Sequence, residues 1–198
     1  MRTDILLCGV GGQGVLSMAA IIGRAAIAGE YFARQSEVHG MAQRGGGVQA
    51  HLRLSGRPIA SDLISRGGAH LVLSMEPLEG LRYLSYLAPD GALITAAEPV
   101  VNIPDYPPLA DLHERIRRIP GATLLEAGRL AAEAGDPQAL NAVMVGAASA
   151  RLPMSVETLE GAVREIFAAK GAAVIELNLA AFRAGRAAVE CDGVAAAR

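Results

Sequence analysis

Hydrophobic and polar positions along the chain follow two spacings, one typical of strands and one typical of helices. Residues 5–8 and 69–74 are short, continuous apolar runs, as expected for strands that are buried on both faces. Residues 48–54 alternate between apolar and polar side chains, which predicts a strand buried on one face. Residues 15–28 are rich in Ala, Ile and Gly, which predicts a helix that lies close against a sheet.

The remaining elements follow from the same patterns. Further strands are predicted at residues 31–35, 59–64, 92–96 and 122–125, and further helices at residues 77–87, 111–118, 126–134, 137–150, 155–169 and 172–189. Strand 59–64 is expected to return antiparallel after a turn at residues 55–58, and residues 89–91 are expected to form a turn. Alternating strands and helices predict a three-layer, Rossmann-like α/β fold, with helices on both faces of a mostly parallel mixed sheet. We expect one domain over residues 1–190 and a disordered tail over residues 191–198.

A glycine turn separates the first strand from the first helix. It contains Gly9, Gly11, Gly12, Gln13 and Gly14. A strand, a glycine turn and a helix form the usual phosphate cradle, because the turn leaves backbone N–H groups unpaired at the positive end of the helix dipole. The turn could also be a tight connection without a ligand. The amide of Gln13 either points into the crevice or is solvated.

A second stretch, over residues 36–47, is dense in polar side chains and glycine. Its candidate binding residues are Ser36, Glu37, His39, Gln43, Arg44 and Gly45. We expect this stretch to be a loop after the second strand, at the same sheet edge as the glycine turn. A guanidinium fork suits a phosphate or a carboxylate, although Arg44 could instead form an ion pair with Glu37. His39 is the tentative catalytic residue, and its alternative is a structural role.

Together the two stretches resemble the gamma-type subunits of the 2-oxoacid:ferredoxin oxidoreductases, most closely the small subunits of the indolepyruvate-oxidising members. The motifs that carry this resemblance are Gly9-Val10-Gly11-Gly12-Gln13-Gly14 and Ser36-Glu37-Val38-His39-Gly40-Met41-Ala42-Gln43-Arg44-Gly45-Gly46. The resemblance implies a subunit of an enzyme that acts on the oxo group of its donor. That enzyme decarboxylates an aryl 2-oxoacid, passes electrons to ferredoxin and transfers the acyl group to coenzyme A, its substrate. Thiamine diphosphate, Mg and iron–sulfur clusters are expected in a large partner subunit. Ferredoxin is expected to interact with that partner subunit.

The composition limits what the chain can do alone. Cys8 and Cys191 cannot supply a four-cysteine iron–sulfur cluster, and the spacing of the four histidines predicts no metal site. A net charge of -2 gives no basic footprint for nucleic acid, and no apolar run is long enough to span a membrane. Few cysteines and no signal-peptide pattern indicate the cytoplasm. A hydrophobic content of 52% suggests surface for another chain, so the isolated chain is expected to form a homodimer.

Two other functions are compatible with a glycine turn. One is a stand-alone nucleotide-binding module with a regulatory role. The other is an NAD-dependent reductase. It is disfavoured because the predicted second strand does not end in the acidic residue that would bind the ribose of NAD, and because no Tyr-x-x-x-Lys pair is present. Glu76 is expected to cap the helix that follows it, and Asn141 is a minor candidate for the crevice. His51 and His70 are expected to be structural.

Overall fold

The computed structural model describes residues 2–39 and 45–195, which form a single mixed sheet covered by helices. The strands are β1 (Arg2–Val10), β2 (Phe32–His39), β3 (Gly47–Ser55), β4 (Ala69–Ser74), β5 (Leu87–Ala96) and β6 (Thr123–Leu125). Their order in the sheet is β2-β3-β1-β4-β5-β6. Strands β1, β4, β5 and β6 are parallel, and β3 is antiparallel to both of its neighbours. The predicted mostly parallel, mixed sheet is confirmed.

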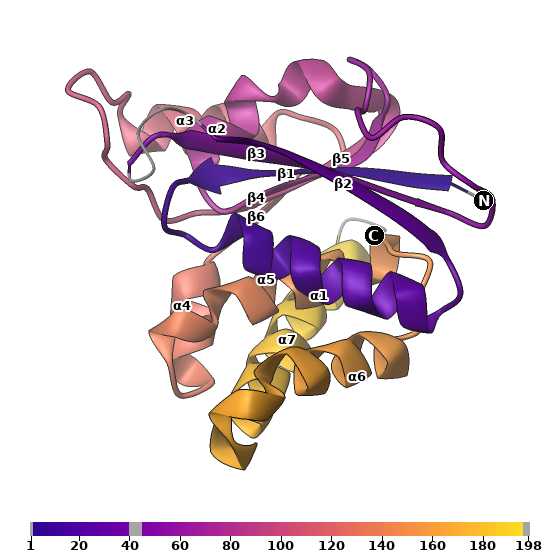
Figure 1. The fold of residues 1–198 in the computed structure, drawn as a ribbon. Coiled ribbons are helices and arrows are strands. Elements are labelled where there is room, and N and C mark those ends of the chain that lie inside the picture. Colours follow the sequence, from indigo (N-terminus) through magenta and orange to yellow (C-terminus); the bar gives the residue numbers. More distant parts are fainter. Residues whose placement is uncertain (1, 40–44, 196–198) are drawn as a thin grey trace.

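Helices cover both faces of this sheet, as predicted. They are α1 (Val15–Ala28), α2 (Pro77–Arg82), α3 (Leu109–Arg117), α4 (Ala127–Glu133), α5 (Leu140–Ala148), α6 (Val156–Phe167) and α7 (Ala172–Ala195). Figure 1 shows α2 and α3 on one face and α1 with α4 to α7 on the other. In the described part of the chain, no helix combines the length and the apolar character that crossing a bilayer requires.

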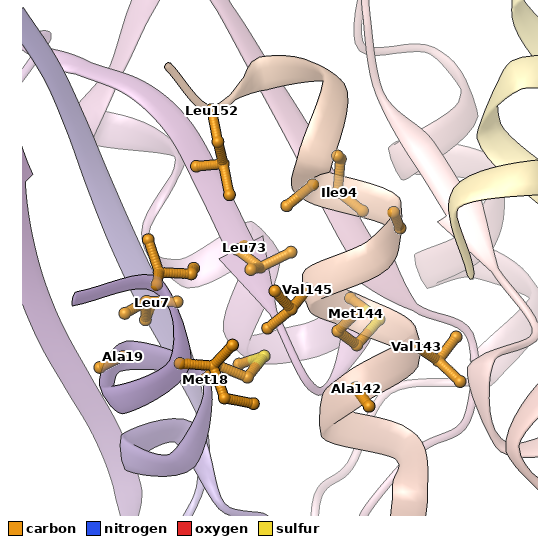
Figure 2. Close-up of a cluster of buried hydrophobic side chains, with 14 of the residues drawn as sticks. Leu7, Met18, Ala19, Leu73, Ile94, Ala142, Val143, Met144, Val145 and Leu152 are labelled. Atoms are coloured by element: carbon orange, nitrogen blue, oxygen red, sulfur yellow. The ribbon is translucent and has the colours of Figure 1, made fainter. Parts of the chain in front are cut away.

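Two hydrophobic clusters fill the two sides of the sheet. In β1, Ile5 and Leu7 belong to the larger cluster under α1 and α5, while Leu6 and Cys8 belong to the smaller cluster under α2 and α3. Figure 2 shows Leu7, Leu73 and Met18 meeting α5 in the larger cluster. All of these side chains are fully buried. Burying a large aliphatic side chain contributes about 1.5–3 kcal/mol, so these clusters fix the sheet on which the site is built.

Helices α5 and α7 pack closely through two glycines. A Cβ atom added to Gly146 of α5 would overlap the carbonyl oxygen of Phe182 in α7. A Cβ atom added to Gly185 of α7 would likewise overlap the carbonyl oxygen of Val143. The close contact between these helices therefore depends on a glycine in each of them.

The prediction of a strand at residues 59–64 is wrong. These residues follow an irregular path, and the buried side chain of Arg53 donates from Nη1 to the carbonyl oxygens of Ser61 (2.8 Å) and Leu63 (2.9 Å). Arg53 is itself held by the fully buried carboxylate of Asp4, at 2.9 Å from Nε to Oδ1. A side chain therefore satisfies the carbonyl groups that a strand ladder would have paired.

Three predicted boundaries also differ. Pro89, Asp90 and Gly91 lie inside β5, where its register against β4 shifts, rather than in a turn before it. Helix α2 ends at Arg82 and a 3-10 turn, η1 (Leu84–Tyr86), replaces the rest of the predicted helix. Helix α7 continues to Ala195, so residues 191–195 are helical where a tail was expected, and residues 196–198 lie outside the described residues.

Candidate functional site

The glycine turn lies at the carboxyl end of β1, and its backbone requires glycine at several positions. Gly12 and Gly14 have φ angles of 102° and 80°, a region that L-residues rarely adopt. A Cβ atom on Gly9 would lie 2.9 Å from Cβ of Met75 at the end of β4. Sterics thus explain these glycines without a ligand, and the case for binding depends on what surrounds the turn.

The side chain of Gln13 fastens the turn to the neighbouring strand. Its Oε1 accepts from the backbone N–H of Val10 at 2.7 Å, and its Nε2 donates to the carbonyl oxygen of Met75 at 3.0 Å. The amide is therefore bonded at both ends within the chain. The side chain is only partly buried and also lies on the wall of a cavity beside the turn.

The turn and the second motif stretch are joined by backbone hydrogen bonds. The N–H of Gly11 donates to the carbonyl oxygen of Gly46 at 2.8 Å, and the N–H of Gly45 donates back to Gly11 at 3.5 Å. In the sheet, Val10 is paired with Gly47. The turn and residues 45–47 of the second stretch therefore lie at the same edge of the sheet, as predicted.

The second stretch begins as a strand, which corrects the predicted loop. Strand β2 extends to His39 because its backbone pairs with β3 through His39 and Val48. Ser36 and Glu37 lie inside this strand and point to opposite faces. Through the shared partner His51, Ser36 lies level with Leu6, about 14 Å before the end of β1.

His39 is the strand residue that reaches the site edge, since its partner Val48 also pairs with Gly9. The side chain of His39 and all of Gln43 and Arg44 fall outside the described residues. Of the predicted binding residues, the structure therefore brings together Gly9, Gly11, Gly12, Gln13, Gly14 and Gly45. It separates Ser36 from them.

Two cavities of different character flank the glycine turn. The first has a volume of about 450 Å³ and is lined by Gly12, Gly14 and the polar side chains of Gln13, Ser17, Gln138 and Asn141, with Met75, Pro137 and Leu140. The second has a volume of about 290 Å³, and its side chains are those of Val10, Val15, Leu16 and Val48. The turn thus separates a polar space from an apolar one.

Asn141 gives the polar cavity its clearest sign of binding capacity. Its amide lies against Gly14, where an added Cβ atom would overlap Nδ2. Its Oδ1 is buried and has no hydrogen-bond partner in the described part of the chain. The start of α1 also borders this cavity, and no side chain caps it. At α5 the 3-10 turn η2 (Pro137–Ala139) runs directly into the helix, and the carboxylate of Asp136 caps that turn. Uncapped N–H groups at the start of α1 favour an anion, so this cavity suits a phosphate or carboxylate.

Comparison with known proteins decides the family. Residues 4–188 match the pyruvate ferredoxin/flavodoxin oxidoreductase family. The chain belongs to this family. It is 36% identical to the indolepyruvate oxidoreductase subunit IorB of Methanothermobacter thermautotrophicus, over 93% of this chain and 96% of that subunit. The resemblance stated from the two motif stretches is confirmed.

Solved structures of this oxidoreductase family share the fold. The gamma subunit of a keto/oxoacid ferredoxin oxidoreductase from Geobacter sulfurreducens is 26% identical, with a TM-score of 0.69, and the match covers 96% of this chain and 99% of that one. The 2-oxoglutarate:ferredoxin oxidoreductase of Magnetococcus marinus, solved with 2-oxoglutarate, coenzyme A and succinyl-CoA bound, has a TM-score of 0.76 at 19% identity. That match covers 96% of this chain and 31% of the longer one, so it concerns the fold alone.

Beside the hairpin formed by β2 and β3, this oxidoreductase subunit has two buried glutamates, Glu76 and Glu79. The sequence did not predict that they lie together. Glu76 caps α2, as predicted, because its Oε2 accepts from the N–H of Glu79 at 2.8 Å. Tyr106 donates its hydroxyl proton to Glu76. Glu79 lies against Gly47 of the hairpin, and its burial raises the pKa of its carboxyl although the nearby Arg82 acts in the opposite direction.

The segment over residues 97–108 crosses the same edge and is tied to the hairpin. Asn102 donates from Nδ2 to the carbonyl oxygen of Gly45 at 2.7 Å. Near the other end of this segment, Tyr106 donates a hydrogen bond to Glu76. Burial, together with this hydrogen bond, raises the pKa of the Tyr106 hydroxyl. Long-range pairings of this kind carry no periodic signal, which is why Ser17, Gln138 and Asn102 were not predicted.

Two histidines are structural, as predicted. Nδ1 of His51 accepts from the backbone N–H of Ile64 at 3.1 Å, and its ring packs edge-on against Tyr86. Nδ1 of His70 accepts from the backbone N–H of Asp4 at 3.0 Å. Both rings hold backbone segments far from the glycine turn.

Proposed function

We propose that the chain is the small subunit of a thiamine diphosphate-dependent 2-oxoacid:ferredoxin oxidoreductase that acts on indolepyruvate or another aryl pyruvate. The observation that carries this proposal is the similarity to indolepyruvate oxidoreductase subunits over nearly the whole chain. In this reaction the 2-oxoacid loses carbon dioxide and two electrons, which pass to ferredoxin. The remaining acyl group forms a thioester with coenzyme A, whose thiol loses its proton.

The large partner subunit holds thiamine diphosphate, Mg and the iron–sulfur clusters, which when bound supply the decarboxylation and the electron path. The small subunit contributes binding and orientation at the carboxyl edge of its sheet. There the hydrogen bonds between Gly11, Gly45 and Gly46 join the glycine turn to the start of the β3 side of the second stretch. Such an edge can position an anionic group at a shared site without forming any covalent bond to it.

Coenzyme A is the substrate that we assign to the two cavities, because it has an anionic part and an uncharged part. Its diphosphate is anionic and would lie in the polar cavity, with Ser17, Gln138 and Asn141 as hydrogen-bonding partners. Its uncharged pantetheine arm suits the cavity lined by Val10, Val15, Leu16 and Val48. Arg44 is proposed to hold an anionic group at the same edge, and His39 remains the tentative residue for hydrogen bonding to a developing oxyanion.

A negative charge introduced into the polar cavity tests the coenzyme A assignment. In the assembled enzyme, Asn141→Asp should raise the KM for coenzyme A about tenfold or more, since a carboxylate would face the diphosphate. Asn141→Ser should change it less, and neither variant should alter the KM for the 2-oxoacid. Gln49→Glu, on the neighbouring strand β3, is the matched control. An unchanged KM for coenzyme A in Asn141→Asp would assign the glycine turn to packing on the partner's backbone instead.

The choice of substrate is tested with the assembled enzyme and a set of 2-oxoacids. Indolepyruvate, phenylpyruvate and 4-hydroxyphenylpyruvate should support ferredoxin reduction, with kcat/KM values at least tenfold above those for pyruvate and 2-oxoglutarate. We place the enzyme in the cytoplasm, where reduced ferredoxin is used. A stand-alone regulatory module would instead bind a nucleotide tightly without any large partner subunit.

A further inference from the structure

Strand β2 (Phe32–His39) forms an outer edge of the sheet, with β3 on one side only. On its other side, alternate residues direct backbone N–H and C=O groups away from the sheet, where another strand can pair with them. Natural edge strands are commonly protected by short length, by proline or by charged side chains, lysine above all. Strand β2 has eight residues, contains neither Pro nor Lys, and carries Arg34 and Glu37 as its two charges. Its length and backbone leave room for another strand, provided that these charges are accommodated.

Two large apolar side chains beside this edge are exposed. Phe32 and Val38, which are 49% and 48% exposed, lie on the same face of β2. On the other face a groove of about 580 Å³ runs between α1, β2 and α6. Ala20, Gly23 and Ile27 of α1 line it at helical spacing, and Ile27 is 62% exposed. The ion pair between Arg24 and Glu165 also lies on its wall. This groove is larger than either cavity at the glycine turn and lies apart from them.

We propose that β2 pairs antiparallel with β2 of a second copy of the chain, about a two-fold axis at Gln35, so that the two sheets become one. The two-fold axis must run perpendicular to the sheet, because only then do the corresponding faces of the two sheets lie on the same side of the joined sheet. Residues opposite one another across antiparallel strands share a face. A symmetric register must therefore be centred on one residue of β2.

Charge and apolar pairing select that residue. A centre at Arg34 or at Glu37 would place two like charges directly opposite each other, which is destabilising. A centre at Ser36 would place Arg34 opposite Val38 and carry Phe32 past the described end of the partner strand. A centre at Gln35 places Phe32 opposite Val38 in both halves of the dimer, Arg34 opposite Ser36, and Gln35 opposite its own copy. Aromatic and β-branched side chains are favourable cross-strand partners.

Other charges near the edge are compatible with this register. Arg34 already has a partner in Asp62, at 3.1 Å, on its own chain. Glu37 would face the small side chain of Ala33. On the helical side, the two grooves would meet across the axis, where Ala20 and Gly23 allow the two α1 helices to approach. The edge and the groove together offer an isologous surface, the kind that a two-fold dimer needs.

Disulfide trapping tests this register directly. In a Cys191→Ser background, Gln35→Cys places two thiols on the axis, with Cα atoms about 4.5–5.5 Å apart, within disulfide range. Mild oxidation of the full chain at micromolar concentration should convert most of it to a covalent dimer. Ser36→Cys is the matched control, because its two Cα atoms would be about 8 Å apart, beyond disulfide range. Cys8 is buried, and burial raises the pKa of its thiol to about 12, so it should not contribute.

Sedimentation separates this proposal from its alternatives. The wild-type chain should sediment as a dimer, and Phe32→Glu with Val38→Glu should give a monomer with an unchanged Tm. A monomeric wild-type chain would overturn the proposal, as would equal trapping of the Gln35→Cys and Ser36→Cys variants. If the double variant instead stays dimeric but no longer binds the large subunit, this surface belongs to the partner and the proposal is wrong. None of these results depends on the oxidoreductase activity, so the proposed function can stand or fail separately.

Discussion

The backbone N–H of Gly11 donates a hydrogen bond of 2.8 Å to the carbonyl oxygen of Gly46, and this bond joins the two motif stretches of the chain. Gly11 belongs to the turn that starts α1, whereas Gly46 belongs to the hairpin between β2 and β3. Both partners contribute backbone atoms only. The edge of the sheet therefore presents a continuous backbone surface, bordered by a polar cavity and an apolar one.

Gly14 is expected to be the least replaceable glycine of the turn. Gly14→Ala should lower the free energy of unfolding by roughly 1–3 kcal/mol, because a positive φ and a clash with Asn141 act together. Gly12→Ala is the matched control, since its φ is also positive but an added Cβ atom meets nothing within 4 Å. Urea unfolding should rank Gly14→Ala below Gly12→Ala, and Asn141→Ala should recover part of the difference. Equal losses for the two glycine variants would mean that Asn141 does not restrict the turn.

The contact between α5 and α7 should tolerate no added methyl group. Gly146→Ala and Gly185→Ala should each destabilise the chain by roughly 1–3 kcal/mol or more, because each Cβ atom would meet a backbone carbonyl of the facing helix. Gly161→Ala in α6 should instead stabilise it by about 0.5–1 kcal/mol, since that position is helical and has open space around it. Thermal melts of the three variants would refute this explanation if Gly161→Ala were the most harmful.

Glu79 should make stability depend on pH. Burial raises the pKa of its carboxyl above the ordinary value of 4.5, so the folded chain keeps a proton that the unfolded chain has already lost. The free energy of unfolding should therefore fall as pH rises from 4.5 to the raised pKa, and then level off. Glu79→Gln should remove this part of the slope, while Glu114→Gln on the exposed side of α3 should retain it. Urea midpoints that shift in parallel with pH in all three proteins would contradict the assignment.

Arg44 tests the part of the site that only the sequence predicts. If its guanidinium holds an anionic group, Arg44→Ala should lower kcat/KM of the assembled enzyme about 10- to 100-fold, since such a contact is worth roughly 1.5–3 kcal/mol. Arg44→Lys should restore only part of the activity, because an ammonium cannot form the two-pronged contact. A lower Tm with normal kinetics would instead assign Arg44 to a structural ion pair.

Periodicity predicted most of the fold because each buried face leaves a regular trace in the sequence. The apolar runs of β1 and β4 and the alternation in β3 were sufficient to predict these strands. The strand expected at residues 59–64 failed for a physical reason. Arg53 reaches across the sheet from β3 to satisfy two carbonyl groups there, and a single side chain leaves no pattern in the segment that it supports.

The candidate site was predicted only where local chain geometry is decisive. Glycines at a strand end predict a turn, and two polar motifs predict a shared edge, as found. The partners that complete the site, Asn141 from α5 and Asn102 from the segment before α3, are distant in sequence and were weak or absent as predictions. Ser36 was misplaced because the length of β2 is set by its pairing with β3 and not by its own composition.

One reconstitution measures the central claim, that this chain works only as part of a larger oxidoreductase. The purified chain, a large thiamine- and cluster-containing partner, and their mixture are each assayed for indolepyruvate-dependent reduction of ferredoxin with coenzyme A, thiamine diphosphate and magnesium. We predict background rates for this chain alone, and at least a hundredfold higher rate for the mixture than for either part. Turnover by this chain alone, or full activity of the partner without it, would contradict the account.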